Sequence, residues 1–76
     1  MPHVIVKMLS GRSEKQKQQL AEEITKVVMN ITGNSEDAVS VAIEDVAQKD
    51  WTEKVYNTDI KHNWDKLYKK PGYKPA

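Results

Sequence analysis

Three residues stand out as able to do chemistry, and Pro2 is the first of them, with Arg12 and Trp51. Initiator Met1 is normally trimmed before a residue as small as proline, and trimming turns the Pro2 nitrogen into a secondary amine with a lone pair. An α-amino group titrates near about 8, and burial or a neighbouring cation lowers that pKa. Pro2 is therefore a candidate general base at neutral pH. The alternative is a structural proline that opens a strand, where a missing backbone donor is tolerated.

Arg12 is the single arginine of the chain; the eleven other basic residues are lysines. It follows Gly11 and precedes the helix expected to begin at Ser13. A guanidinium binds a carboxylate with two parallel hydrogen bonds, which an ammonium does less well. The amides at a helix start also favour anions. Arg12 is thus a candidate carboxylate ligand, and the alternative is a solvated loop arginine.

Trp51 follows the second expected strand, where an indole can form the wall of a pocket. The alternative is a hydrophobic anchor for the last helix. Trp64 is expected in the core, and His3 is expected to be an ordinary strand residue. With His3 and His62 as the only imidazoles and no cysteine, a metal site is not expected.

The elements that must position these residues follow from hydrophobic spacing. Residues 2–8 are rich in β-branched side chains and predict a strand. Ser13 and Gln16 fit a capping box, and an apolar stripe at helical spacing runs from there to a stop at Gly33. A second strand is expected at 39–44. Strand, helix and strand in this order predict a parallel βαβ unit with a right-handed crossover.

We therefore expect an α/β fold in one domain. The expected parts are a βαβ core over 2–45, a C-terminal helix over 51–70 and a tail over 71–76, all within one domain of residues 1–76. The expected apolar stripe of the C-terminal helix comprises Tyr56, Ile60, Trp64, Leu67 and Tyr68.

Length and composition predict an oligomer. A chain of 76 residues without cysteine buries too little surface to be more than marginally stable alone. Two strands do not form a stable sheet either, so dimerisation is expected to complete a larger sheet. The net charge of +1 argues against nucleic-acid binding. Because no apolar run approaches a membrane span of about 20 residues and no signal peptide is recognised, a cytoplasmic location is expected.

Topology separates the candidate residues within one chain. Pro2 begins the first strand and Arg12 lies beyond its end, about 20 Å away. Parallel strands place Ser40 at the Pro2 end and Trp51 at the Arg12 end. A partner related by a two-fold axis brings Pro2 of one chain to Arg12 and Trp51 of the other. The sequence thus predicts a site shared between two subunits.

In these features the chain resembles the 4-oxalocrotonate tautomerase family. The resemblance rests on Met-Pro before a strand, Gly11-Arg12-Ser13 before a long helix, the strand ending at Glu44, and the aromatic Trp51. It covers residues 2 to about 55. The extension, with its Lys69-Lys70-Pro71-Gly72-Tyr73 segment, is similar to a longer, dimeric bacterial branch that includes phenylpyruvate-type tautomerases.

The resemblance implies a tautomerase fold, like that of macrophage migration inhibitory factor, and interconversion of enol and keto forms of a small 2-keto acid. It implies that Pro2 is the general base, that Arg12 binds the substrate carboxylate and that Trp51 lines the pocket, without cofactor or metal. Ser40 departs from the family pattern because hexameric members carry a second arginine there. A serine hydroxyl donates a hydrogen bond but brings no charge, which favours a phenylpyruvate-like substrate over a dicarboxylate such as 2-hydroxymuconate.

Two other functions remain open from the sequence. A related proline-based hydratase, dehalogenase or decarboxylase would recruit an acid to activate water, and Glu44 and Asp45 are the available carboxylates. A dimeric module that kept the fold without the base is the non-enzymatic alternative. The donor to the developing oxyanion is also open among Ser40, the Trp51 N–H, a tyrosine and backbone amides.

Overall fold

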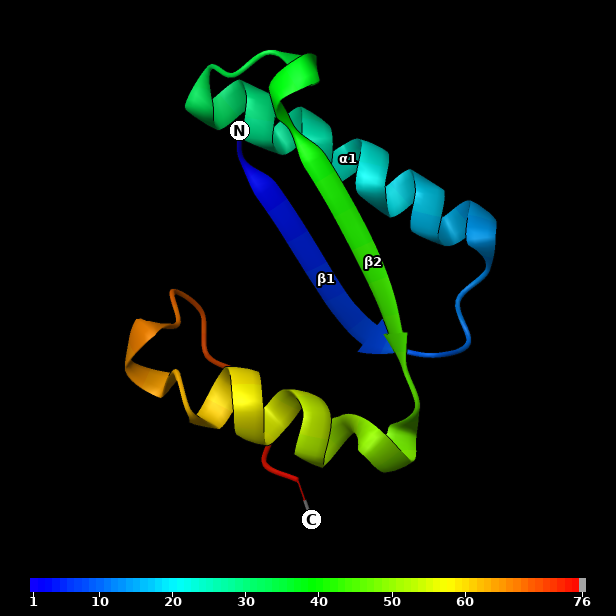
Figure 1. Ribbon diagram of the computed structural model, residues 1–76, viewed down its shortest axis with the longest axis vertical. Helices are drawn as coiled ribbons and strands as arrows, with labels where there is room; N and C mark the ends of the chain where they lie inside the picture. The colour runs from blue at the N-terminus through cyan, green and yellow to red at the C-terminus, as the bar shows by residue number, and fades with distance from the viewer. Residues whose placement is uncertain (76) are drawn as a thin grey trace.

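The computed structural model describes residues 1–75 and shows a βαβ unit followed by a C-terminal helical segment (Figure 1). Strand β1 spans His3–Leu9, helix α1 spans Glu14–Thr32 and strand β2 spans Ser40–Val46. The two strands pair in parallel, which confirms the expected α/β class. A short 3₁₀ turn, η1 (Glu36–Ala38), leads from α1 into β2. Ala76, the end of the expected tail, lies outside the described residues.

The register of the two strands decides what each face of the sheet presents. His3 pairs with Ser40 and Leu9 with Val46, and successive side chains point to opposite faces. The face of Met8 and Asp45 is the one that α1 covers, since Lys17 on α1 bonds to Asp45. The opposite face, with Lys7, meets the C-terminal helix.

Helix α1 begins and ends where its sequence signals predict. The Ser13 hydroxyl accepts from the Gln16 amide at 3.1 Å, and the Gln16 side chain accepts from the Ser13 amide at 3.0 Å. At the other end Gly33 is left-handed (φ 78°), and its N–H reaches the Met29 carbonyl, a conformation that costs glycine little. Within residues 1–75, no helix combines the length and apolar character needed to cross a membrane.

The C-terminal helix is shorter and wider than expected. A 3₁₀ turn, η2 (Gln48–Asp50), leads into η3 (Thr52–Lys61), a π-helix, and a separate 3₁₀ turn, η4 (Trp64–Lys66), follows. The expected helix over 51–70 therefore ends at Lys61.

Asn63 gives the physical reason for this early end. Its side-chain amide donates to the carbonyls of Thr58 and Asp59, so it competes with continued backbone hydrogen bonding. The hydrogen bond from the His62 N–H to the Asn57 carbonyl shows π-type winding. This winding has more residues per turn than an α-helix, so apolar residues at α-helical spacing no longer share one face. As a result Tyr68, expected on that stripe, is fully exposed.

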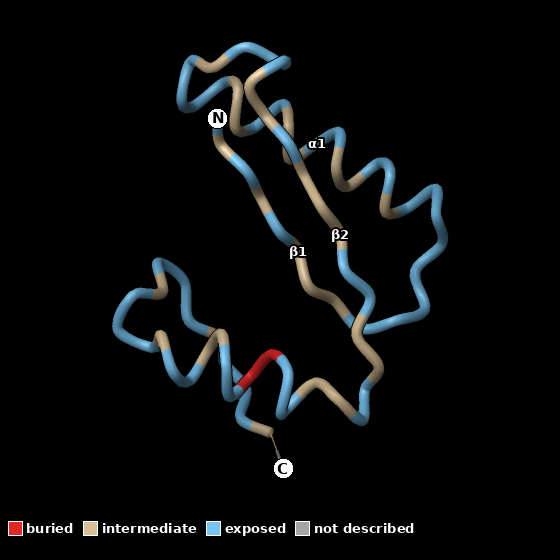
Figure 2. The backbone as a smooth tube through the Cα atoms, in the orientation of Figure 1, coloured by how far each residue is buried: buried red, intermediate tan, exposed pale blue. Residues whose placement is uncertain are grey.

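Very little of the described chain is buried (Figure 2). Among residues 1–75, Val55 and Tyr56 on η3 are the only buried apolar side chains, at 5% and 8% exposure. Large apolar residues on both strand and helix stay in contact with solvent, including Ile5 on β1 and Ile31 on α1, the latter 80% exposed. A single chain thus leaves much of its apolar surface uncovered.

Candidate active site

Pro2 is held at the amino end of the sheet. Its carbonyl accepts a hydrogen bond from the Ser40 backbone N–H at 3.2 Å, which extends the strand pairing by one step. Met1 projects outward with 98% of its surface exposed, and its amino group donates to the Ala38 carbonyl. While Met1 is attached, the Pro2 nitrogen is a tertiary amide and has no basic lone pair. Removal of Met1 creates a ring amine next to the carbonyl that the sheet holds.

Ser40 lies at the Pro2 end, as a parallel pair requires. Its hydroxyl lies 2.6 Å from Nδ1 of His3, its register partner on β1. The two polar side chains therefore form a hydrogen-bonded pair on the sheet face opposite α1. This arrangement supplies a hydroxyl and an imidazole beside Pro2. The pair contains no guanidinium of the kind that a second arginine at position 40 would supply.

Arg12 lies at the other end of β1, in the loop that enters α1. Gly11 before it has a φ of 124°, a conformation that favours glycine. Arg12 borders a hollow of about 160 Å³ together with Met8, Gln16, Lys17 and Leu20. Within the described residues Arg12 forms no ion pair, so its guanidinium has no carboxylate partner within that part of the chain.

Lys17, which sequence reasoning did not single out, lines the same hollow as Arg12 and forms two ion pairs. Its ammonium lies 2.8 Å from Asp45 on β2 and 2.7 Å from Glu14 on α1. The hydrogen bond to Asp45, and then that to Glu14, raise the pKa of Lys17 above its ordinary value. The Glu14–Lys17 spacing was a usable sequence signal, but the contact with Asp45 requires the folded sheet.

Trp51 is held by the C-terminal segment. Its indole Nε1–H donates to the Tyr73 hydroxyl at 2.8 Å. The Tyr73 ring packs against Tyr56 with centroids 5.7 Å apart and planes tilted by 52°. Tyr73 was expected to lie in a tail, and no sequence signal pairs it with Trp51 across 22 positions.

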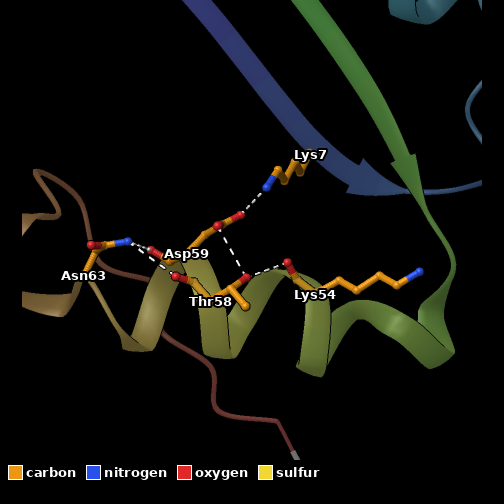
Figure 3. Close-up of polar contacts among 5 residues, drawn as sticks. All are labelled: Lys7, Lys54, Thr58, Asp59 and Asn63. Atoms are coloured by element: carbon orange, nitrogen blue, oxygen red, sulfur yellow. Dashed lines mark hydrogen bonds and ion pairs between the residues drawn. The ribbon is translucent and has the colours of Figure 1, made fainter.

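Lys7 and Asp59 form a second unpredicted contact (Figure 3). The Lys7 ammonium on β1 lies 2.5 Å from the Asp59 carboxylate on η3. The hydrogen bond to Asp59 is the main cause that raises the pKa of Lys7 above its ordinary value. Trp51 lines the hollow of about 420 Å³ between these elements, together with Ile5, Lys7, Val55, Asp59 and Ile60.

The fold of one chain brings Pro2 and Ser40 together but does not bring Pro2 to Arg12. Strand β1 has seven residues and lies between Pro2 and Arg12. At about 3.3 Å per residue, the strand separates these two residues by roughly 23 Å. Arg12 shares its hollow with Met8, whereas Trp51 shares one with Leu9, and these neighbours point to opposite faces. The candidate site is therefore incomplete within a single chain.

The sequence of this chain is similar to those of known tautomerases. A family model described as "Tautomerase enzyme" matches residues 2–54. The chain is 47% identical over 73 residues to a "Probable tautomerase" of Xylella fastidiosa, covering 96% of this chain and 89% of the relative. It is 39% identical over 74 residues to "Tautomerase PptA" of Cronobacter sakazakii, covering 96% and 97%.

A solved structure shows the same backbone arrangement. A 4-oxalocrotonate tautomerase isozyme from Methylibium petroleiphilum superposes with a TM-score of 0.64 at 32% identity, covering 66% of this chain and 81% of that one. The matched family region contains both strands, α1, Pro2, Arg12, Ser40 and Trp51. The chain belongs to the tautomerase family, which includes the 4-oxalocrotonate tautomerases.

Proposed function

We propose that this chain is a cofactor-independent keto–enol tautomerase that acts on a 2-keto acid through the amino group of Pro2. The observation that carries the proposal is the hydrogen bond from the Ser40 N–H to the Pro2 carbonyl at 3.2 Å. It holds the Pro2 backbone at the end of a paired strand while Met1 stands 98% exposed. A second residue as small as proline favours removal of Met1, and removal unblocks the nitrogen.

In the proposed reaction, the neutral Pro2 nitrogen takes a proton from the enol hydroxyl or from the carbon beside the carbonyl. The prolinium then returns a proton to the other atom. Because one group serves first as base and then as acid, its pKa must lie near the working pH. Proton transfer of this kind contributes about 10²–10⁴-fold to a rate.

The proposal places Arg12 of one subunit at Pro2 of its partner in a homodimer. Support comes from the separation of the two residues along β1 and from apolar side chains left exposed in one chain, such as Ile5 and Ile31. A two-fold partner both covers apolar surface and completes the site. The substrate carboxylate then binds the Arg12 guanidinium bidentately.

A substrate with one carboxylate and an apolar tail suits the residues best. Ser40 occupies the end of the sheet beside Pro2, and its hydroxyl is paired with His3, so a second carboxylate finds no guanidinium in that pair. The Trp51 N–H is donated to Tyr73, which favours Ser40, a tyrosine or backbone amides over Trp51 as donors to the oxyanion. Phenylpyruvate enol fits this description better than 2-hydroxymuconate.

The test begins with the mass of the purified protein, which we expect to be lower than the full sequence by one methionine residue. Ketonization of phenylpyruvate enol and of 2-hydroxymuconate is then measured for wild type and Pro2→Ala. The expected loss in Pro2→Ala is about 10²-fold or more. The matched control is the same chain prepared with Met1 retained, which keeps every side chain and blocks only the nitrogen. Unchanged rates in either protein would overturn the assignment of the base.

The two alternatives differ from this proposal in measurable ways. A hydratase, dehalogenase or decarboxylase needs a carboxylate to activate water, yet Asp45 is bound to Lys17 at 2.8 Å and Glu44 is exposed. A non-catalytic dimeric module would retain Met1 and would show no ketonization. For location, the expectation of a cytoplasmic protein stays a prediction.

A further inference from the structure

Tyr73, in the C-terminal segment, contacts Trp51. Trp51 donates its indole N–H to the Tyr73 hydroxyl at 2.8 Å. The Tyr73 ring also packs on Tyr56, with centroids 5.7 Å apart, and Tyr56 is one of the two buried apolar residues on η3. Tyr73 is therefore anchored by its ring and holds Trp51 by its hydroxyl. Tyr73 lies beyond the region that the family model matches, residues 2–54.

We infer that Tyr73 is a positioning residue, which fixes the orientation of the Trp51 indole and so sets the shape of the pocket for the apolar tail of the substrate. The inference rests on the proposed tautomerase function and adds to it a determinant outside the matched region. Tyr73 acts through Trp51 and does not exchange a proton with the substrate.

A hollow beside the two rings is the space that this contact shapes. It has a volume of about 470 Å³ and is lined by Leu9, Gln48, Trp51, Thr52, Tyr73 and Pro75. That volume lies within the range of about 300–1,000 Å³ typical of small-molecule sites. Apolar and aromatic walls with few polar groups suit an aryl or alkyl tail better than a second carboxylate.

The hydrogen bond fixes an otherwise rotatable side chain. The indole turns about two side-chain torsions, and an N–H that loses its partner turns toward water. The wall touches a part of the substrate that does not react, so it contributes equally to binding in the ground state and in the transition state. Loss of such uniform binding raises KM and leaves kcat unchanged.

The first experiment compares Tyr73→Phe with Tyr68→Phe in the full chain. Both variants lose one hydroxyl, and Tyr68 is fully exposed. We expect Tyr73→Phe to raise KM for phenylpyruvate enol about two- to tenfold with kcat unchanged, and to leave KM for the enol of pyruvate unchanged. Tyr68→Phe is expected to match wild type. Equal KM values in wild type and Tyr73→Phe would overturn the inference, as would a selective loss of kcat.

Trp51 fluorescence reports the same contact without any substrate. In a Trp64→Phe background Trp51 is the single tryptophan, and Tyr73→Phe is expected to shift its emission to the red because the indole N–H then meets water. An unchanged spectrum would contradict the contact.

A double-mutant cycle separates positioning from a direct role. In a Trp51→Phe background, Tyr73→Phe should add no further change in KM, because the indole it positions is absent. A full additional effect would show that Tyr73 acts on the substrate itself and would overturn the inference. If wild type shows no ketonization at all, the proposed function fails instead; if wild type is active and Tyr73→Phe matches it, only the inference about Tyr73 fails.

Discussion

Asp59 on η3 accepts a hydrogen bond from the Lys7 ammonium on β1 at 2.5 Å, and this ion pair spans 52 positions of sequence. It connects the C-terminal helix to the sheet face opposite α1 (Figure 3). Trp51 and Val55 line the same hollow between helix and strand. The pair therefore contributes to the placement of the helix that follows Trp51.

Replacement of Lys7 by methionine should reduce stability in a pH-dependent way. The hydrogen bond to Asp59 raises the pKa of Lys7 above its ordinary value of 10.5. The contribution of a raised lysine pKa is fully present below 10.5 and is lost as pH rises through the raised value. Urea unfolding at pH 8 and pH 11 should thus show a larger alkaline loss of unfolding free energy in wild type than in Lys7→Met.

Lys49→Met is the control for that comparison because Lys49 is exposed. The pKa of Lys17 is also raised, by Asp45 and then Glu14, so part of the alkaline loss should persist in Lys7→Met. The same alkaline loss in wild type and Lys7→Met would show that the pair with Asp59 contributes nothing in solution.

Substitution Ser13→Ala should destabilise the protein by about 1 kcal/mol, because the hydroxyl that caps the Gln16 amide is lost. Ser35→Ala is a matched control, since Ser35 precedes a short helical turn without a side-chain cap bond. Urea denaturation monitored by circular dichroism measures both. Equal midpoints for the two variants would contradict the energetic role of the capping box.

Substitution Arg12→Ala should raise KM for a 2-keto acid enol about 10- to 100-fold, because a hydrogen-bonded charge contact with the carboxylate is lost. Arg12→Lys should fall between wild type and alanine, since it keeps the charge without bidentate geometry. Lys15→Ala, an exposed cation nearby, controls for general electrostatics. An Arg12→Ala enzyme with an unchanged KM would remove Arg12 from the site.

Mixing Pro2→Ala with Arg12→Ala should restore activity, measured at an enol concentration well below the raised KM of Arg12→Ala, where each variant alone is slow. In a mixed dimer with shared sites, one site carries both substitutions and the other carries neither, so random exchange should recover about a quarter of wild-type activity. Steady-state rates after denaturation and joint refolding measure this. Two Arg12→Ala preparations mixed together provide the baseline, and a mixture that stays at that baseline would place Pro2 and Arg12 in the same subunit.

Local physical chemistry allowed most of the βαβ unit to be predicted from sequence. The Ser13 capping box, the Gly33 stop and the alternating strands are short-range signals. They therefore predict the helix ends and the strands correctly without knowledge of packing. The same signals placed Ser40 at the Pro2 end and Arg12 at the far end of β1. They also predicted that a single chain does not bring Pro2 to Arg12.

By itself, then, the sequence determined the parallel βαβ order and the separation of Pro2 from Arg12. Only the tertiary structure decided where the C-terminal helix ends and what Trp51 contacts. Asn63 ends the helix by bonding to Thr58 and Asp59, and the chain then returns so that Tyr73 meets Trp51. These contacts depend on how distant segments pack, and apolar periodicity records which face is buried but not which side chain lies against it.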